Sequence, residues 1–191
     1  MRCYNCHCFS LLSFCDACYQ ELSELSLGFR ELEEGFKVYY FYKYSEIKHL
    51  LHSKHKFHGY FVLNSLAKLS FAKFKDMFKI DSQITAIALD DRVENSLYSH
   101  SAILARQLKS KAIKLKFGVL HSRSKCKYSG KSVEFRLKNK RDYVLLKPIN
   151  SPVILVDDIV TTGLSILEAK KTLAKHGIET LFALVLADAK Q

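Results

Sequence analysis

Residues 153–165 read VILVDDIVTTGLS. The first four residues are apolar and predict a buried strand, and the end of the stretch leads into a predicted helix over 165–176. Gly177 ends that helix, and the apolar run at 180–187 predicts another buried strand. A strand, a helix and a strand at this spacing form a parallel crossover unit. The sequence therefore predicts an α/β fold with a parallel sheet and helices on both faces.

The segment that follows the predicted strand at 153–156 has the composition of an anion-binding loop. Asp157 and Asp158 follow the strand at the carboxyl end of the sheet, where open α/β sheets bind ligands. We expect Gly163 to adopt a positive φ, which lets successive backbone amides converge on an anion beside a helix N-terminus. Further donors are available from three hydroxyl groups, those of Thr161, Thr162 and Ser165. The loop therefore predicts a site for a phosphate monoester.

The two acids need a partner beside this anion. Hydroxyl donors or a divalent cation would supply one, and a ribose offers a vicinal diol with room for Mg²⁺ nearby. Acids and phosphate loop together predict recognition of a ribose 5-phosphate. The alternative is that Asp157 and Asp158 only help to cap the following helix. The glycine and lysine pattern of a Walker loop is absent from the chain.

Cysteines are concentrated at the N-terminus. Cys3 and Cys6 form one C-x2-C pair, Cys15 and Cys18 form another, and eight residues separate the pairs. This spacing predicts a closed four-thiolate site, which is structural rather than catalytic, with zinc as its expected ion. Disulfides and an iron–sulfur cluster are the alternatives, but a reducing compartment does not favour disulfides. A segment this short needs the ion for its folding energy.

Other residues of this region are left over from the pattern. Cys8 is a surplus thiol that fits neither pair, and His7 could replace one cysteine. Cys126 lies in a basic segment and is interpreted as an incidental thiol. Apolar residues between the two pairs are expected to pack against the main domain or to cover the metal, namely Leu11, Leu12 and Phe14.

Amino-acid composition limits the classes of protein to which this chain can belong. The chain has 191 residues, 48% of them apolar, which is enough to bury a core. It has no apolar run of the roughly 20 residues that span a bilayer and no secretory signal, so we expect a soluble protein of the cytoplasm. Residues 35–152 hold 24 basic and 8 acidic side chains. Such an excess attracts phosphates of nucleotides or nucleic acids, although solvated surface lysines explain it equally well.

Hydrophobic patterns predict the other elements. Helices are expected within 19–34, from 45 to 51, over 63–78 and over 102–108, and strands at 37–42, 84–89, 113–120 and 143–146. Residues 90–99 are expected to form a loop, and residues 121–142 a mobile loop followed by a short helix. Two units are predicted, a knuckle with a linker helix over 1–34 and a main domain over 35–191.

The stretch 153–165 resembles, over all its residues, the motif that binds phosphoribosyl pyrophosphate (PRPP) in type I phosphoribosyltransferases. The preceding four-cysteine knuckle narrows the resemblance to the ComF family, which is associated with natural competence. Three further segments are similar to that family: residues 44–51 (YSEIKHLL), 102–105 (AILA) and 136–139 (RLKN). The resemblance implies a Rossmann-like type I phosphoribosyltransferase domain behind a small zinc-binding knuckle.

Site residues also follow from the resemblance. Asp157 and Asp158 would hold the ribose hydroxyls as catalytic residues, and the loop would hold the 5-phosphate of PRPP, with Mg²⁺ as cofactor. The implied PRPP-binding set is Asp157, Asp158, Ile159, Val160, Thr161, Thr162, Gly163, Leu164, Ser165 and Arg92.

The pyrophosphate region departs from the family. Where the family carries Pro-Val-Pro and Arg-Gly-Phe-Asn-Gln, this chain has ALD at 88–90 and SLYSH at 96–100. Asp90 and Asp91 would repel a pyrophosphate unless Mg²⁺ intervened, so Arg92 is the better contact.

Family membership implies a role in natural transformation. The protein would handle incoming single-stranded DNA at the cytoplasmic side, with competence-machinery proteins as possible partners. The densest basic stretch could hold the DNA, with Tyr128 and Phe135 stacking on bases, or could be a solvated lid over the site. That stretch comprises Lys114, Lys116, Arg123, Lys125, Lys127, Lys131, Arg136, Lys138, Lys140 and Arg141. The alternative is a conventional phosphoribosyltransferase of nucleotide metabolism that acts on a small nitrogenous acceptor.

Overall fold

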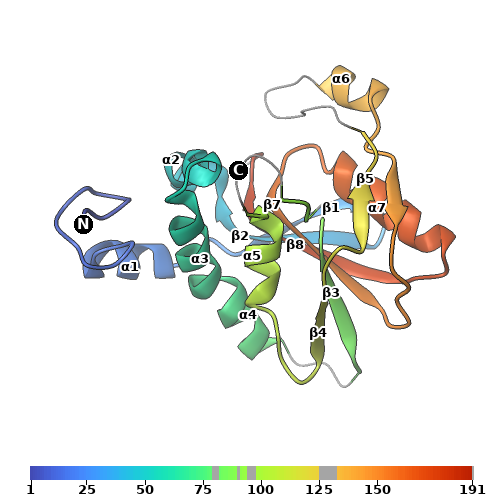
Figure 1. The fold of residues 1–191 in the computed structure, drawn as a ribbon, viewed down its shortest axis with the longest axis horizontal. Coiled ribbons are helices and arrows are strands. Elements are labelled where there is room, and N and C mark those ends of the chain that lie inside the picture. Colours follow the sequence, from blue (N-terminus) through green and yellow to red (C-terminus); the bar gives the residue numbers. More distant parts are fainter. Residues whose placement is uncertain (79–81, 90, 94–97, 125–132, 191) are drawn as a thin grey trace.

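A six-stranded sheet forms the centre of the molecule (Figure 1). This computed structural model describes residues 1–78, 82–89, 91–93, 98–124 and 133–190. The strands, in the order in which they lie side by side, are β1 (Gly28–Glu33), β2 (Phe36–Lys43), β8 (Thr180–Asp188), β7 (Val153–Val160), β3 (Ile84–Ala88) and β4 (Ile113–Lys116). β1 runs antiparallel to β2, and every other neighbouring pair is parallel. The predicted α/β fold is confirmed, and the sheet is parallel as predicted except for β1.

Helices cover both faces of the sheet, as Figure 1 shows. One face is covered by α2 (Tyr44–Leu51), the short helix η1 (His52–His55), α3 (Gly59–Leu69), α4 (Phe71–Met77) and α5 (His100–Arg106). The other face is covered by α7 (Leu164–Lys175) and by a two-stranded sheet of β5 (Leu120–Ser122) and β6 (Tyr143–Leu145). Each face has its own apolar core. None of the described helices combines the length and apolar character needed to cross a bilayer.

The crossover unit β7–α7–β8 has the predicted order, but β7 is longer than its apolar run. Register pairs join β7 to β8 from Val153 to Val160. On its other edge, β7 pairs with β3 only as far as Val156, opposite Ala88. The described part of β3 therefore leaves the segment that contains the acid pair without a partner on that edge. Apolar patterning missed this extension because Asp157 and Asp158 interrupt it.

The prediction of a linker helix within 19–34 is wrong for the second half of that range. Helix α1 spans Asp16–Ser23, and the chain then forms β1, which pairs with β2 as a hairpin. Gly35 makes the turn at φ +73°, and its amide donates to Glu31 Oε1. The leucines of this segment have helical spacing, but pairing of the segment with β2 outweighs that local preference. The predicted division after residue 34 falls in the turn of this hairpin.

Two other predicted elements are each divided in the structure. The strand expected over 113–120 ends at Lys116, and Gly118, at φ +63°, turns the chain into β5 of the second sheet. The helix expected over 63–78 is interrupted at Ser70, whose hydroxyl donates to the carbonyl oxygen of Leu66. Both interruptions lie at residues whose local geometry departs from the regular element.

The N-terminal segment packs against the main domain through part of its apolar set. Phe14 is 2% exposed and belongs to the same core as α3, together with Cys3 and Cys18. Leu11 and Leu12 are 81% and 68% exposed, so the expectation that they pack against the main domain is wrong for these two residues. A short helix, α6 (Val133–Lys138), projects beyond β5 at the top of Figure 1.

Candidate functional site

The predicted motif lines a cavity of about 360 Å³ at the carboxyl end of β7. Every residue from Asp157 to Ser165 contributes to the lining. Residues from outside the motif complete it: Tyr44, Lys54, Arg141, Ile166, Glu168 and Ala189. Arg92, although it lies within the described chain, does not line this cavity. The structure thus brings together nine of the ten residues predicted to bind the ligand.

Gly163 has the backbone conformation that the sequence predicts. Its φ is +80°, in the left-handed region, and it directly precedes the first residue of α7. The amide of Leu164 lies 3.4 Å from Thr162 Oγ1. The first turn of a helix carries amides with no partner within the helix and the positive end of its dipole. A positively polarised helix end therefore borders the cavity beside the loop hydroxyls.

Arg30 of β1 contacts the loop between β7 and α7. Its Nη2 donates to the carbonyl oxygen of Thr161 at 2.7 Å, and its Nη1 lies 3.2 Å from Asp188 Oδ1. The Asp188 side chain is fully buried at the end of β8. One guanidinium therefore joins β1, the loop and the last strand, and this contact fixes the position of the loop. No local sequence pattern indicates it, because the residues are far apart in the chain.

Asp158 is paired with Lys54 of the short helix η1, which also lines the cavity. Lys54 Nζ lies 2.6 Å from Asp158 Oδ2, and the two side chains are 19% and 13% exposed. His100 Nδ1 lies 3.9 Å from the same oxygen. Burial raises the pKa of Asp158, but Lys54 and then His100 outweigh it and hold the pKa below its usual value. Asp158 is therefore an ionised carboxylate in the free protein.

The pKa of Asp157 is shifted in the opposite direction to that of Asp158. Burial, and then the adjacent charge of Asp158, raise the pKa of Asp157 to about 7. Its Oδ1 accepts the amide of Asp158 at 2.9 Å, and Arg141 partly offsets the rise. Successive residues of a strand point to opposite faces, which places the two acids in different surroundings. The cavity therefore holds one firmly ionised carboxylate and one that titrates near neutral pH.

The site lies in a region of the chain that is similar to a known protein family. Residues 99–191 match the phosphoribosyl transferase domain. The matched region contains α5, β7, the loop, α7 and β8, and hence both acids. The chain thus contains a phosphoribosyltransferase domain with an α/β fold. No curated protein sequence matched the chain.

Strands outside the matched region complete the sheet of the phosphoribosyltransferase domain. β2 pairs with β8, and β3 pairs with β7, so residues before 99 flank the motif on both sides. Lys54 and Arg30 also lie outside the match. Sequence reasoning missed both residues, because an isolated basic residue in a basic chain carries no signal of its own.

Asp91, in the region expected to contact pyrophosphate, has a structural role. Asp91 Oδ2 accepts the amide of Gly118 at 2.7 Å, and Asp91 Oδ1 lies 3.1 Å from His121 Nε2. The Asp91 side chain is 5% exposed and does not line the cavity. Asp91 therefore holds the turn before β5, and its side chain is not among the groups that a ligand in this cavity would contact. Asp90 lies outside the described residues.

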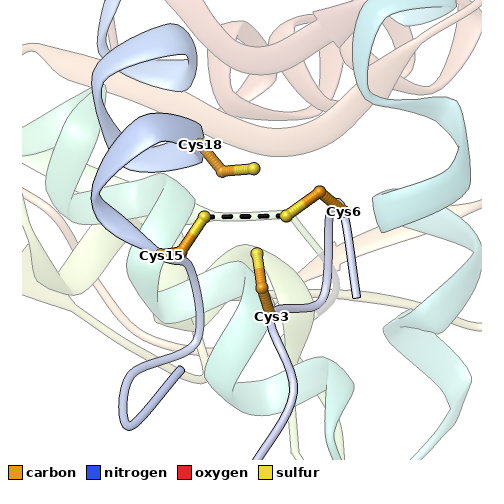
Figure 2. Close-up of side chains that lie close together, drawn as sticks. All are labelled: Cys3, Cys6, Cys15 and Cys18. Atoms are coloured by element: carbon orange, nitrogen blue, oxygen red, sulfur yellow. Dashed lines mark hydrogen bonds between the residues drawn. The ribbon is translucent and has the colours of Figure 1, made fainter. Parts of the chain in front are cut away.

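A second candidate site lies in the N-terminal segment. Cys3, Cys6, Cys15 and Cys18 present one sulfur each, and these four atoms lie within 4.8 Å of one another. Figure 2 shows the side chains converging from the N-terminal loop and from the start of α1. Cys6 Sγ and Cys15 Sγ are 3.6 Å apart. The geometry fits a single tetrahedral metal ion held by thiolates.

Neighbouring groups orient this cluster. Asn5 Nδ2 donates to Cys18 Sγ at 3.3 Å, and Asn5 Oδ1 lies 2.6 Å from His49 Nε2 on α2. Burial raises the pKa of the Cys3 thiol, but hydrogen bonds from backbone amides outweigh it and lower the pKa to about 6. Cys8 is exposed, with its sulfur 3.4 Å from Cys6 Sγ, and lies outside the four-sulfur group. The cluster is thus both pre-arranged and tied to α2.

The basic stretch predicted to bind nucleic acid is described only in part. Residues 125–132, including Cys126 and Tyr128, and the side chain of Arg136 lie outside the described residues. Lys116 donates to the carbonyl oxygen of Pro148, and Arg123 lies 3.9 Å from Asp142. Arg141 lines the cavity of the phosphoribosyltransferase domain. The described members of this stretch therefore have different surroundings.

Proposed function

We propose that the cavity binds PRPP together with Mg²⁺. One observation carries this proposal: the acid pair near the end of β7 and the loop between β7 and α7 line the same cavity. The loop of residues 161–165 would hold the 5-phosphate, and Asp157 and Asp158 would accept hydrogen bonds from the ribose hydroxyls. The phosphoribosyltransferase domain matched at residues 99–191 supports this choice of ligand.

Calorimetric titration with PRPP and Mg²⁺ tests the proposal. The double variant Asp157→Asn/Asp158→Asn keeps the side-chain volumes but removes both charges and should abolish binding. Asp76→Asn is the matched control, because Asp76 lies on α4 and is 74% exposed. Unchanged affinity in the double variant would refute the site, and loss of binding in the control would show an unspecific effect of charge.

Group transfer is the alternative use of the same site. In that reaction a nitrogen nucleophile forms a bond to C1 of the ribose while the bond from C1 to the pyrophosphate oxygen breaks, and pyrophosphate leaves with the bonding electrons. The protein contributes position and exclusion of water around an oxocarbenium-like state. Release of pyrophosphate on addition of candidate nitrogenous bases would establish a conventional catalytic phosphoribosyltransferase. Its absence would favour a binding role.

We further propose a role of the ComF type in natural transformation. It is supported by the order of the parts, a four-cysteine cluster followed by a phosphoribosyltransferase domain, and by the net charge of +11. The protein would handle incoming single-stranded DNA at the cytoplasmic side together with competence proteins. Affinity for single-stranded DNA should then fall as the salt concentration rises. On a plot of log affinity against log salt concentration, the slope should be about −0.7 for each phosphate neutralised. A flat salt response would contradict DNA binding.

Zinc is the ion that we propose for the cysteine cluster. Four thiolates in tetrahedral reach form a closed site, with no open position for substrate, and that donor set favours zinc in a reducing compartment. The ion would stabilise the N-terminal segment rather than take part in chemistry.

A further inference from the structure

Two basic side chains, Lys54 and Arg141, are found among the described residues that line the cavity. Arg141 lies on the side of α7, where its backbone amide donates to Glu168 Oε2 at 2.7 Å. Lys54 lies on η1 and contacts Asp158. The two cations therefore flank the acid pair, and only Arg141 is beside the helix that begins at the phosphate loop.

The backbone of Lys54 is fixed from two directions. Its carbonyl oxygen accepts the hydroxyl of Tyr98 at 2.5 Å and lies 2.9 Å from His100 Nε2. Burial lowers the pKa of Lys54, but the Asp158 carboxylate outweighs it and raises the pKa above its ordinary value. The ammonium is therefore charged and held in place. The ammonium has three N–H donors, and one of them donates to Asp158. Within the described part of the chain, the other donors remain available to a ligand.

The Lys54 ammonium and the loop of residues 161–165 lie at different points along the chain direction of β7. Asp158 and Thr161 are three residues apart, which corresponds to roughly 10 Å of extended chain. A ligand whose 5-phosphate occupies the loop and whose ribose contacts Asp158 would therefore meet Lys54 at its other end. Arg92, the cation that the sequence indicates for that end, does not line the cavity.

We propose, on the basis of the PRPP-binding function proposed above, that Lys54 determines ligand specificity by binding the pyrophosphate group on C1. The 5-phosphate and the ribose are common to PRPP and ribose 5-phosphate, so the motif alone does not distinguish them. A charge-assisted hydrogen bond from Lys54 to the second anionic group is available only to PRPP. Lys54 thus selects a sugar phosphate that carries anions at both ends.

Affinities for PRPP with Mg²⁺ and for ribose 5-phosphate, measured by calorimetry, test this role. Lys54→Met should weaken PRPP binding at least tenfold and change ribose 5-phosphate binding less than threefold. Lys56→Met is the matched control, because Lys56 is exposed two residues away and lines a different cavity. The control should leave both affinities unchanged. Equal weakening of both ligands by Lys54→Met, or no weakening, would overturn the proposal.

A double variant separates direct contact from neutralisation of Asp158. Lys54→Met/Asp158→Asn removes both charges of the ion pair, so the net charge of the cavity stays as in the unmodified protein. Both affinities should fall because Asp158 no longer binds the ribose, but the ratio of PRPP to ribose 5-phosphate affinity should stay as low as in Lys54→Met. A ratio restored to its original value would show that Lys54 acts only by offsetting Asp158, which overturns the proposal. Failure of the unmodified protein to bind either ligand would instead refute the proposed function.

Discussion

Arg30 Nη2 donates a hydrogen bond of 2.7 Å to the carbonyl oxygen of Thr161, across 131 positions of the chain. The same guanidinium contacts the buried Asp188. A residue of β1 therefore holds the loop that follows β7, and the position of this loop depends on contacts outside residues 153–165. Both the stability of the fold and the shape of the loop are coupled to this one side chain.

Replacing Arg30 tests that coupling. Arg30→Met leaves Asp188 buried without its cation, which costs about 3–5 kcal/mol for buried pairs. We expect a lower thermal midpoint and, at temperatures where the variant is still folded, about tenfold weaker binding of ribose 5-phosphate. Lys170→Met serves as control, since it removes the partly exposed pair with Glu33 on the same strand. Equal affinities in the two variants would show that Arg30 does not position the loop.

Asp157→Asn should stabilise the protein in a pH-dependent manner. The pKa of Asp157 is raised to about 7 in the folded protein from its ordinary value of 3.8, by burial and by Asp158. Between these values the folded state retains a proton that the unfolded state has released, so this group lowers stability as pH rises. Arg141 and Lys54, the cations that face it, only partly offset this effect.

The expected readout is the thermal midpoint at several pH values. The variant keeps an oxygen to accept the Asp158 amide, so its gain should be near zero at pH 4 and should reach several degrees at pH 8. Asp76→Asn, on exposed α4, should show no such trend. A gain that does not vary with pH would contradict the raised pKa of Asp157.

Metal content tests the cysteine cluster. The protein as purified should hold one zinc equivalent by elemental analysis, and Cys3→Ser/Cys6→Ser should lose it together with much of its thermal stability. Cys8→Ser is the informative control, because Cys8 lies close to Cys6 but outside the four-sulfur group. It should keep its zinc. Absence of zinc from the unmodified protein, or loss of zinc in Cys8→Ser, would refute the assigned ligand set.

The amide of Asn5 provides a subtler test of the same centre. Asn5 links Cys18 to His49, so Asn5→Ala should weaken zinc binding about tenfold without removing a ligand, as loss of such outer contacts does elsewhere. The rate of zinc transfer to a chelator measures this. Asn64→Ala, on α3, removes an amide that bonds to Gln107 and should leave the rate unchanged. Equal rates in the two variants would show that Asn5 is not needed to orient Cys18.

Local sequence explains some of these features and not others. The strand, the positive φ of Gly163 and the helix after it were predictable because each depends on neighbouring residues. The cysteine cluster was predictable because a short spacing already brings two sulfurs together. Lys54 was not predictable, because 104 positions separate it from Asp158 and its neighbours in the sequence are equally basic. The strand β1 was missed because pairing with β2, rather than its own pattern, makes it extended.

The position of Lys54 and Arg30 ahead of residue 99 sets a lower limit on the minimal functional unit. A fragment beginning at α5 would retain the whole motif of residues 153–165. It would lose Arg30, which contacts the loop, Lys54, which contacts Asp158, and the strands β2 and β3, which flank the crossover unit. Such a fragment would carry a recognisable motif without a working pocket. Engineering of a smaller binding module from this chain should therefore begin no later than β1.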